Sequence, residues 1–140
     1  TLKPLKIIHH FEDKALILVL QVARWRPARP LVAFIFKTML PFMPFERLVE
    51  NDHWMAFNHP QPDYPLHILI LPRKFLASIE DVSAEDLEFH NDFYEIVQAL
   101  IAEFELNCRG YRLITNGGPN QQIPYWHWHL ISDLGGNDAP

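Results

Sequence analysis

The sequence has very little cysteine and no excess of positive charge. Its 140 residues include one cysteine, Cys108, which excludes an internal disulfide framework. A lone thiol suits a reducing compartment, so we expect a cytoplasmic protein. The formal net charge is −5. Because there is no general basic field, we expect no nucleic-acid partner, whereas local donors can still hold a small anion.

The sequence also lacks an internal repeat, a low-complexity tract and a long uninterrupted apolar run. Its most hydrophobic stretch, residues 31–45, is interrupted by Lys37, Pro41 and Pro44. This stretch falls short of the roughly 20 apolar residues that span a bilayer. A helix lying in the membrane interface would give peripheral membrane contact, and we favour packing against the domain instead.

The length suits one compact domain. We predict a leading segment over residues 1–30 and a single domain over residues 31–140. The sequence starts at Thr1 and not at Met, which is compatible with processing of an upstream segment.

Apolar periodicity and turn residues predict the order of the elements. The leading segment carries a predicted helix or strand pair over 14–26, and its two Arg-Pro steps, 26–27 and 29–30, are expected to break the chain. The later elements are a helix over 31–40, strands within 46–58 around a turn at Asn51-Asp52, a strand over 66–71, a helix from an N-cap at Ser83 to about Asn107, and strands over 111–115 and 125–132. This order predicts the α+β class, with a mainly antiparallel sheet, one long helix and a short N-terminal helix.

The residues that can carry chemistry gather in the segment Tyr125-Trp126-His127-Trp128-His129. On a strand, side chains alternate between faces, so Tyr125, His127 and His129 are expected to share one face while the two tryptophans enter the core. A neutral imidazole with one free nitrogen can attack phosphorus. Two histidines on a strand are also common as core or surface residues, so the pair alone is weak evidence of catalysis.

A turn-rich loop precedes this segment. It carries neutral donors suited to phosphate oxygens, namely Asn116, Asn120, Gln121 and Gln122. Gly117 and Gly118 would let backbone N–H groups approach an anion closely.

Two blocks of the sequence resemble the histidine triad (HIT) superfamily. Asn116-Gly117-Gly118, Gln121-Gln122 and residues 125–131 resemble its signature, in which three histidines alternate with apolar residues after an Asn and a Gly-Gln pair. Residues 55–60 and 65–74 resemble the first half of the family's domain, and residues 35–37 and 46–50 its opening helix and strand. The blocks follow the family's order and spacing, and the likeness covers about residues 35–134.

The resemblance implies a HIT-like fold and a nucleotide hydrolase or nucleotidyl transferase. Its substrate would be a purine nucleotide or nucleotide conjugate, such as a dinucleoside polyphosphate or a nucleoside phosphoramidate, attacked at the α-phosphate. By resemblance the catalytic residues are His127 as nucleophile, His129 as phosphate support and Gln121 near phosphate or leaving group. The implied nucleotide-binding residues are Asn58 near the ribose, His67 near the nucleoside, and Asn116, Gln122 and Tyr125. For His67, a buried strand histidine is an equally good interpretation.

The sequence departs from the family pattern in three ways, one of which is a loop from Asn116 to the strand about two residues shorter than in the Hint-type branch of the family. Tyr125 stands where the family has its first histidine, and a phenol is no base near neutral pH without help. The Gly-Gln pair reads Gln121-Gln122, which loses a glycine beside the phosphate. These departures leave an alternative hypothesis, a catalytically weak nucleotide sensor or scaffold with the same fold.

Family members often form homodimers through the long helix and the sheet edge, and the resemblance implies the same here unless the leading segment covers that surface. We expect no cofactor and no metal, since the sequence has no Cys-x-x-Cys motif or acidic cluster. Five histidines have no role in this interpretation: His9, His10, His53, His59 and His90.

Overall fold

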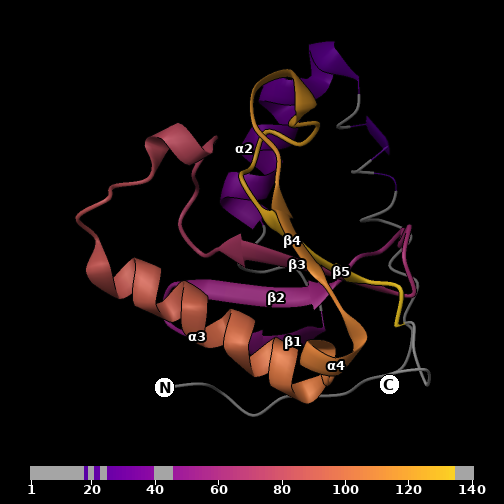
Figure 1. The fold of residues 1–140 in the computed structure, drawn as a ribbon. Coiled ribbons are helices and arrows are strands. Elements are labelled where there is room, and N and C mark those ends of the chain that lie inside the picture. The colour runs from indigo at the N-terminus through magenta and orange to yellow at the C-terminus, as the bar shows by residue number, and fades with distance from the viewer. Residues whose placement is uncertain (1–17, 19–20, 23–24, 40–45, 135–140) are drawn as a thin grey trace.

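The strands form one five-stranded sheet in which every neighbouring pair is antiparallel (Figure 1). The computed structural model describes residues 18, 21–22, 25–39 and 46–134. The strand order is β1-β2-β3-β5-β4. The bounds are β1 Arg47–Glu50, β2 Trp54–Asn58, β3 Leu66–Pro72, β4 Arg112–Thr115 and β5 Trp128–Ser132. The predicted α+β class with a mainly antiparallel sheet is confirmed.

The middle of the sheet is β3, whose residues are all buried. This strand was predicted from a continuous apolar run, which is typical of strands covered on both faces. Its neighbours are β2, which arrives through a short connection, and β5, which arrives from the C-terminal end of the chain. In the β3–β5 register, Leu69 lies opposite His129 and His67 lies opposite Ile131.

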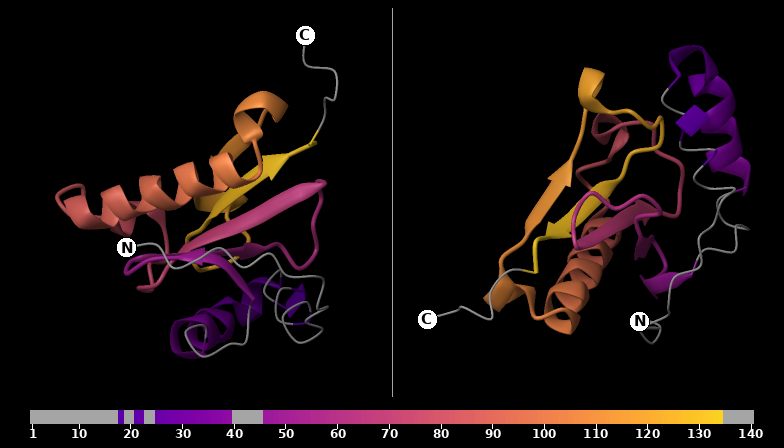
Figure 2. Two further views of the ribbon diagram at one scale, coloured as in Figure 1. Left: turned by 90° about the horizontal axis from the view of Figure 1, so that it is seen from below. Right: turned by 90° about the vertical axis from the view of Figure 1, so that its right-hand side faces the viewer.

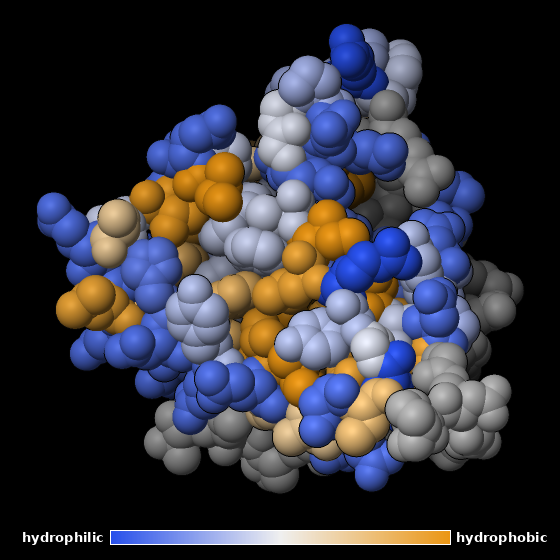
Figure 3. Space-filling view, in the orientation of Figure 1, coloured by the Kyte–Doolittle hydropathy of each residue, from blue (hydrophilic) through white to orange (hydrophobic). Residues whose placement is uncertain are grey.

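One face of the sheet is covered by helix α3, Leu87–Glu103. Trp54 anchors this core, because its ring centroid lies 4.6 Å from that of Phe89 and 4.8 Å from that of Phe93. The Trp54 Nε1–H donates to the Phe89 carbonyl oxygen at 2.8 Å. In Figure 3, drawn from the α3 side, hydrophobic surface gathers toward the middle, and hydrophilic residues are prominent at the top and on the left.

The predicted start of the long helix at Ser83 is wrong. Asp86 is the N-cap, and its Oδ1 accepts from the Phe89 N–H at 3.2 Å. The Ser83 Oγ accepts from the Glu85 N–H at 3.3 Å and forms a separate turn before the helix. Both residue types satisfy free N–H groups at helix starts, so the local sequence offered two starts and the structure uses the later one.

The predicted end near Asn107 is also displaced. Glu105 has a φ of 52°, in the left-handed region that ends a helix. A short helix, α4 Leu106–Arg109, follows it and leads through Gly110 into β4. Leu106 is fully buried, which anchors this second helix in the same core as α3.

The opposite face of the sheet is covered by a short 3-10 helix, η1 Arg26–Ala28, and by helix α2, Arg29–Met39 (Figure 2). The predicted helix over 31–40 is therefore confirmed as far as residue 39. A bend at Trp25 and the separate turn η1 lie at the first Arg-Pro step, whereas the expected break at the second step is wrong because α2 begins there. Pro27 and Pro30 lie in the first turns of η1 and α2, where a missing N–H breaks no helical bond and the fixed φ favours the helix.

Helix α2 has a buried and an exposed side. Ala28 of η1 and Val32 of α2 pack in one cluster with Met55, Phe57, Leu69, Leu71 and Tyr125. Leu31 and Phe34 are exposed. Among the described residues, no helix is both long enough and apolar enough to cross a membrane. Most of the predicted helix or strand pair over 14–26 lies outside the described residues, and the boundary between residues 30 and 31 stays a prediction.

Replacing Val32 by Asp should destabilise the protein. Val32 is 1% exposed, so the variant places an unpaired carboxylate against an apolar cluster. We expect a loss of at least about 2 kcal/mol in the free energy of unfolding, measured by urea denaturation. The matched control is Leu31→Asp on the exposed side of α2, which should change it by less than about 0.5 kcal/mol. Equal losses would show that α2 does not pack against the sheet in solution.

Candidate active site

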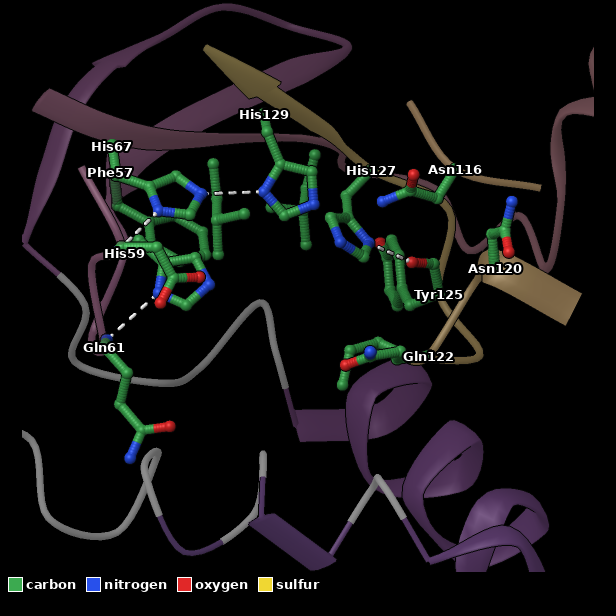
Figure 4. A pocket seen from close by; sticks show the side chains of 14 residues that line it. Phe57, His59, Gln61, His67, Asn116, Asn120, Gln122, Tyr125, His127 and His129 are labelled. Atoms are coloured by element: carbon green, nitrogen blue, oxygen red, sulfur yellow. Dashed lines mark hydrogen bonds between the residues drawn. The ribbon is translucent and has the colours of Figure 1, made fainter. Parts of the chain in front are cut away.

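A cavity of about 240 Å³ opens on the α2 side of the sheet, with apolar residues from β2 and β3 as its base (Figure 4). Its polar side chains divide into two groups. Three histidines lie together at one end, and amide side chains from the loop before β5 lie at the other, with His127 between them. The lining residues are Phe57, His59, Gln61, Asp63, His67, Leu69, Leu71, Asn116, Asn120, Gln122, Ile123, Tyr125, His127 and His129.

The predicted alternation along the last strand is confirmed. Tyr125, His127 and His129 line the cavity, whereas Trp126 and Trp128 pack in the core beneath α3. The predicted start of the strand at residue 125 is wrong, because β5 begins at Trp128. Before it, the Trp126 N–H donates to the Leu76 carbonyl oxygen at 2.8 Å, so this part of the chain is held by the loop after β3.

The side chain of His127 is held in one tautomer by the backbone. Its Nδ1 lies 2.7 Å from the Tyr125 carbonyl oxygen. A carbonyl oxygen only accepts, so Nδ1 carries the proton and Nε2 keeps its lone pair. Burial lowers the pKa of His127, which keeps the ring neutral at physiological pH. His127 therefore presents an unprotonated nitrogen, as a nucleophile requires.

The tautomer of His129 is set by the tautomer of His67. The Asp63 N–H donates to Nδ1 of His67 at 3.2 Å, so the ring proton of His67 is on Nε2. That nitrogen lies 2.9 Å from Nδ1 of His129 and donates to it. The proton of His129 is therefore on Nε2, where it can serve as a hydrogen-bond donor. Burial, followed by the neighbouring His127 and His67, lowers the pKa of His129 to about 3.

The third histidine of the group is His59, which the sequence prediction did not assign to the site. Its Nδ1 accepts from the Gln61 N–H at 3.0 Å, and its ring stacks on His67 with centroids 4.1 Å apart. Burial and the neighbouring His67 lower its pKa to about 4. His59 directly follows β2 and faces the same side as Phe57, so alternation from the strand end was the signal that pointed to it.

Two residues implied by the resemblance are placed outside the cavity lining. Asn58 is exposed, because alternation along β2 turns it away from Phe57 and His59. Gln121 is buried, and its side-chain amide donates to the carbonyl oxygens of Ala77 and Ile123. The structure therefore places neither Asn58 nor Gln121 in the cavity lining, and the Gln121 amide holds the loop in place. Their expected contacts with ribose and phosphate stay predictions.

The remaining predicted residues lie together as expected, since His67, Asn116 and Gln122 all line the cavity. Tyr125 lines it as well, but its hydroxyl donates to the Pro72 carbonyl oxygen at 2.6 Å. Burial raises the pKa of Tyr125. The phenol is therefore held in the core as a neutral group, and it is not a base.

Known proteins with this architecture support the resemblance. Residues 43–135 match the family described as the HIT domain. A HIT-like protein of Chlamydia pneumoniae is 32% identical over 88 residues, 61% of this chain and 79% of the relative. A solved HIT family hydrolase from Legionella pneumophila is 30% identical, with a TM-score of 0.61 over 68% of this chain and 87% of that one. A histidine triad protein from Clostridium difficile is 25% identical, with a TM-score of 0.62 over 71% and 88%.

The antiparallel sheet, with the long helix α3 on one face and the histidine-lined cavity on the other, has the fold of the solved HIT proteins. Because the family match spans most of the chain, the chain belongs to the histidine triad (HIT) superfamily.

The buried histidines should make stability depend on pH. In the unfolded chain, His59 and His129 have their ordinary pKa of 6.5. In the folded chain, the pKa is about 4 for His59 and about 3 for His129. The unfolded state then holds more protons, so the free energy of unfolding falls as the pH is lowered from about 6.5 to about 4 for His59 and to about 3 for His129. Urea denaturation at a series of pH values should show that His129→Gln makes this fall shallower. Gln122→Ala, which changes a cavity residue that does not titrate, should keep the wild-type slope. An unchanged slope in His129→Gln would contradict the assignment.

Proposed function

We propose that the protein is a nucleotide hydrolase or nucleotidyl transferase that acts at the α-phosphate of a nucleotide conjugate. The observation that carries this proposal is the 2.7 Å contact between His127 Nδ1 and the Tyr125 carbonyl oxygen. This contact leaves Nε2 of a neutral imidazole free in a cavity that also contains N–H donors. The 30% identical hydrolase of the same fold supports the same class of reaction.

In the first step, the lone pair of His127 Nε2 forms a bond to the α-phosphorus. The bond from phosphorus to the leaving group breaks, and its electron pair stays on the leaving group. The ring gains positive charge and keeps its Nδ1–H on the Tyr125 carbonyl oxygen, which stabilises that charge. The Nε2–H of His129 and the amides of Asn116 and Gln122 are the donors for the phosphate oxygens.

In the second step, water attacks the phosphorus of the nucleotidyl-histidine. The N–P bond breaks, its electrons return to Nε2, and a nucleoside monophosphate is released with loss of the water proton to solvent. Another acceptor in place of water would give nucleotidyl transfer. The covalent intermediate divides one displacement into two easier ones.

Removing the nucleophile should abolish turnover. With adenosine phosphoramidate and diadenosine polyphosphates as substrates, His127→Ala should release AMP at least about 10³-fold more slowly than wild type. Mass spectrometry after a brief incubation, on samples kept free of acid because acid hydrolyses the N–P bond, should find an AMP adduct on wild type and none on the variant. His90→Ala, altered on α3 away from the cavity, is the matched control and should turn over normally. AMP release that persists in His127→Ala would refute the mechanism.

Among the described residues that line the cavity, none is placed as a proton donor for the leaving group. The titratable side chains that line the cavity are four histidines held neutral, Asp63, and Tyr125 with its hydroxyl on Pro72. Rates should therefore fall roughly 3–10-fold per unit of leaving-group pKa across a series of aryl esters of AMP. The Tyr125→Phe variant should give the same slope. If the wild-type rate does not depend on leaving-group pKa but the Tyr125→Phe rate does, the phenol protonates the leaving group.

The structure also favours one alternative, a nucleotide sensor or scaffold. Because the Tyr125 hydroxyl is committed to Pro72, it adds nothing to the departure of the leaving group. A sensor would bind AMP in calorimetry and release no product from any substrate. Turnover that depends on His127 would exclude this alternative.

We further propose a cytoplasmic homodimer. Its exposed, unbridged Cys108 fits a reducing compartment. Strand β4 is an edge of the sheet and exposes Ile114, so it can pair with a second copy. Light scattering during gel filtration measures the mass of the assembly directly.

A further inference from the structure

The three histidines at one end of the cavity converge on a small volume. One ring nitrogen from each of His59, His67 and His129 lies within 4.8 Å of the other two. They come from the end of β2, from β3 and from β5, so no short motif contains them. His67 is buried and the other two are half-buried, which leaves one side of the group open to the cavity (Figure 4).

We propose that His59, His67 and His129 form a site for a divalent transition metal such as Zn²⁺, whose occupancy blocks the active site. Three neutral imidazoles are a suitable ligand set for Zn²⁺, and the open side supplies a fourth position for water or another ligand. Binding stands independently of the proposed function, whereas the block of turnover rests on it.

The hydrogen bond between two of these rings gives the metal its position. His67 Nε2 and His129 Nδ1 are 2.9 Å apart, close to the roughly 3.3 Å between two nitrogens of a tetrahedral zinc site with bonds of about 2.0–2.1 Å. The metal replaces the shared proton, and His59 completes the set when its nitrogen, now within 4.8 Å of the other two, moves closer to them. The sequence prediction of no metal site did not include this group because its members are separated along the chain.

Metal binding requires His67 to change its tautomer. Its proton moves from Nε2 to Nδ1, with no net change of charge, and the bond from the Asp63 N–H is lost. His59 either binds through Nδ1 and loses its bond from the Gln61 N–H, or binds through Nε2 and moves that proton to Nδ1. Burial lowers the pKa of His67, and the Asp63 carboxylate lies close enough to oppose part of that shift. This carboxylate can accept from the new Nδ1–H of His67, an arrangement that often supports metal-binding histidines. The lost hydrogen bond weakens the site, so its occupancy is reversible.

The same change explains a block of turnover. His129 is the histidine expected to donate to the phosphate, and the metal would draw it toward His67 and His59. His127 is not a ligand, and its Nδ1 stays on the Tyr125 carbonyl oxygen. Nucleotide and metal therefore compete for one cavity, and each should weaken binding of the other.

Binding can be tested without any substrate. Every protein compared in this experiment carries His9→Gln and His10→Gln. These substitutions remove an adjacent histidine pair that could itself bind Zn²⁺. Competition against a chromophoric chelator should give one Zn²⁺ per chain, and Co²⁺ should give the visible absorption of a tetrahedral site. His59→Gln should weaken binding at least about tenfold, whereas His127→Gln, the matched control, should bind as wild type does. Equal affinity in His59→Gln, or loss only in His127→Gln, would overturn the proposal.

Ring ¹⁵N spectra keep the proposal testable if His59→Gln fails to fold. In the protein with His59, His67 and His129 intact, Zn²⁺ should move the His67 proton from Nε2 to Nδ1. The tautomer of His127 should stay unchanged. An unchanged His67 tautomer at saturating Zn²⁺ would also overturn it. AMP release is measured separately with and without Zn²⁺. Metal binding without any metal-free turnover would defeat only the proposed function, and turnover without metal binding would defeat only the metal site.

Discussion

The hydrogen bond from His127 Nδ1 to the Tyr125 carbonyl oxygen sets the chemistry of the cavity. Without it the neutral ring could place its proton on either nitrogen, and its lone pair would point toward the cavity only part of the time. A backbone carbonyl is a suitable partner because it cannot donate. The backbone thus fixes which nitrogen of His127 keeps its lone pair, whatever side chain residue 125 carries.

The same logic applies at the other end of the cavity, where main-chain N–H groups act on histidines. The N–H groups of Asp63 and Gln61 donate to His67 and His59, and His67 passes this constraint to His129. Each ring is buried enough to stay neutral. The proton positions in the cavity therefore depend on the path of the backbone between β2 and β3 as much as on the histidines themselves.

The sequence predicted the parts of the site that depend on local periodicity. His127 and His129 face the cavity and the two tryptophans face α3 because alternation needs only neighbouring residues. Asn58 was assigned one position away from His59, and a shift of one residue on a strand selects the opposite face. Gln121 turns inward because its amide bonds Ala77, a contact between distant loops that no local pattern contains. The helix start was misplaced because Ser83 and Asp86 are both good capping residues.

The central position of β5 has a consequence for synthesis. Strand β3 pairs on one edge with β2, which is nearby in the chain. Its other edge pairs with β5, which is synthesised much later, since His129 of β5 lies 62 residues after His67 of β3. Until that strand leaves the ribosome, β3 presents an open apolar edge of the kind that pairs with other chains. The late strand also brings His129, so the cavity and the protection of β3 are completed by the same event. A nascent chain is therefore most vulnerable to aggregation in the interval just before its last strand pairs with β3.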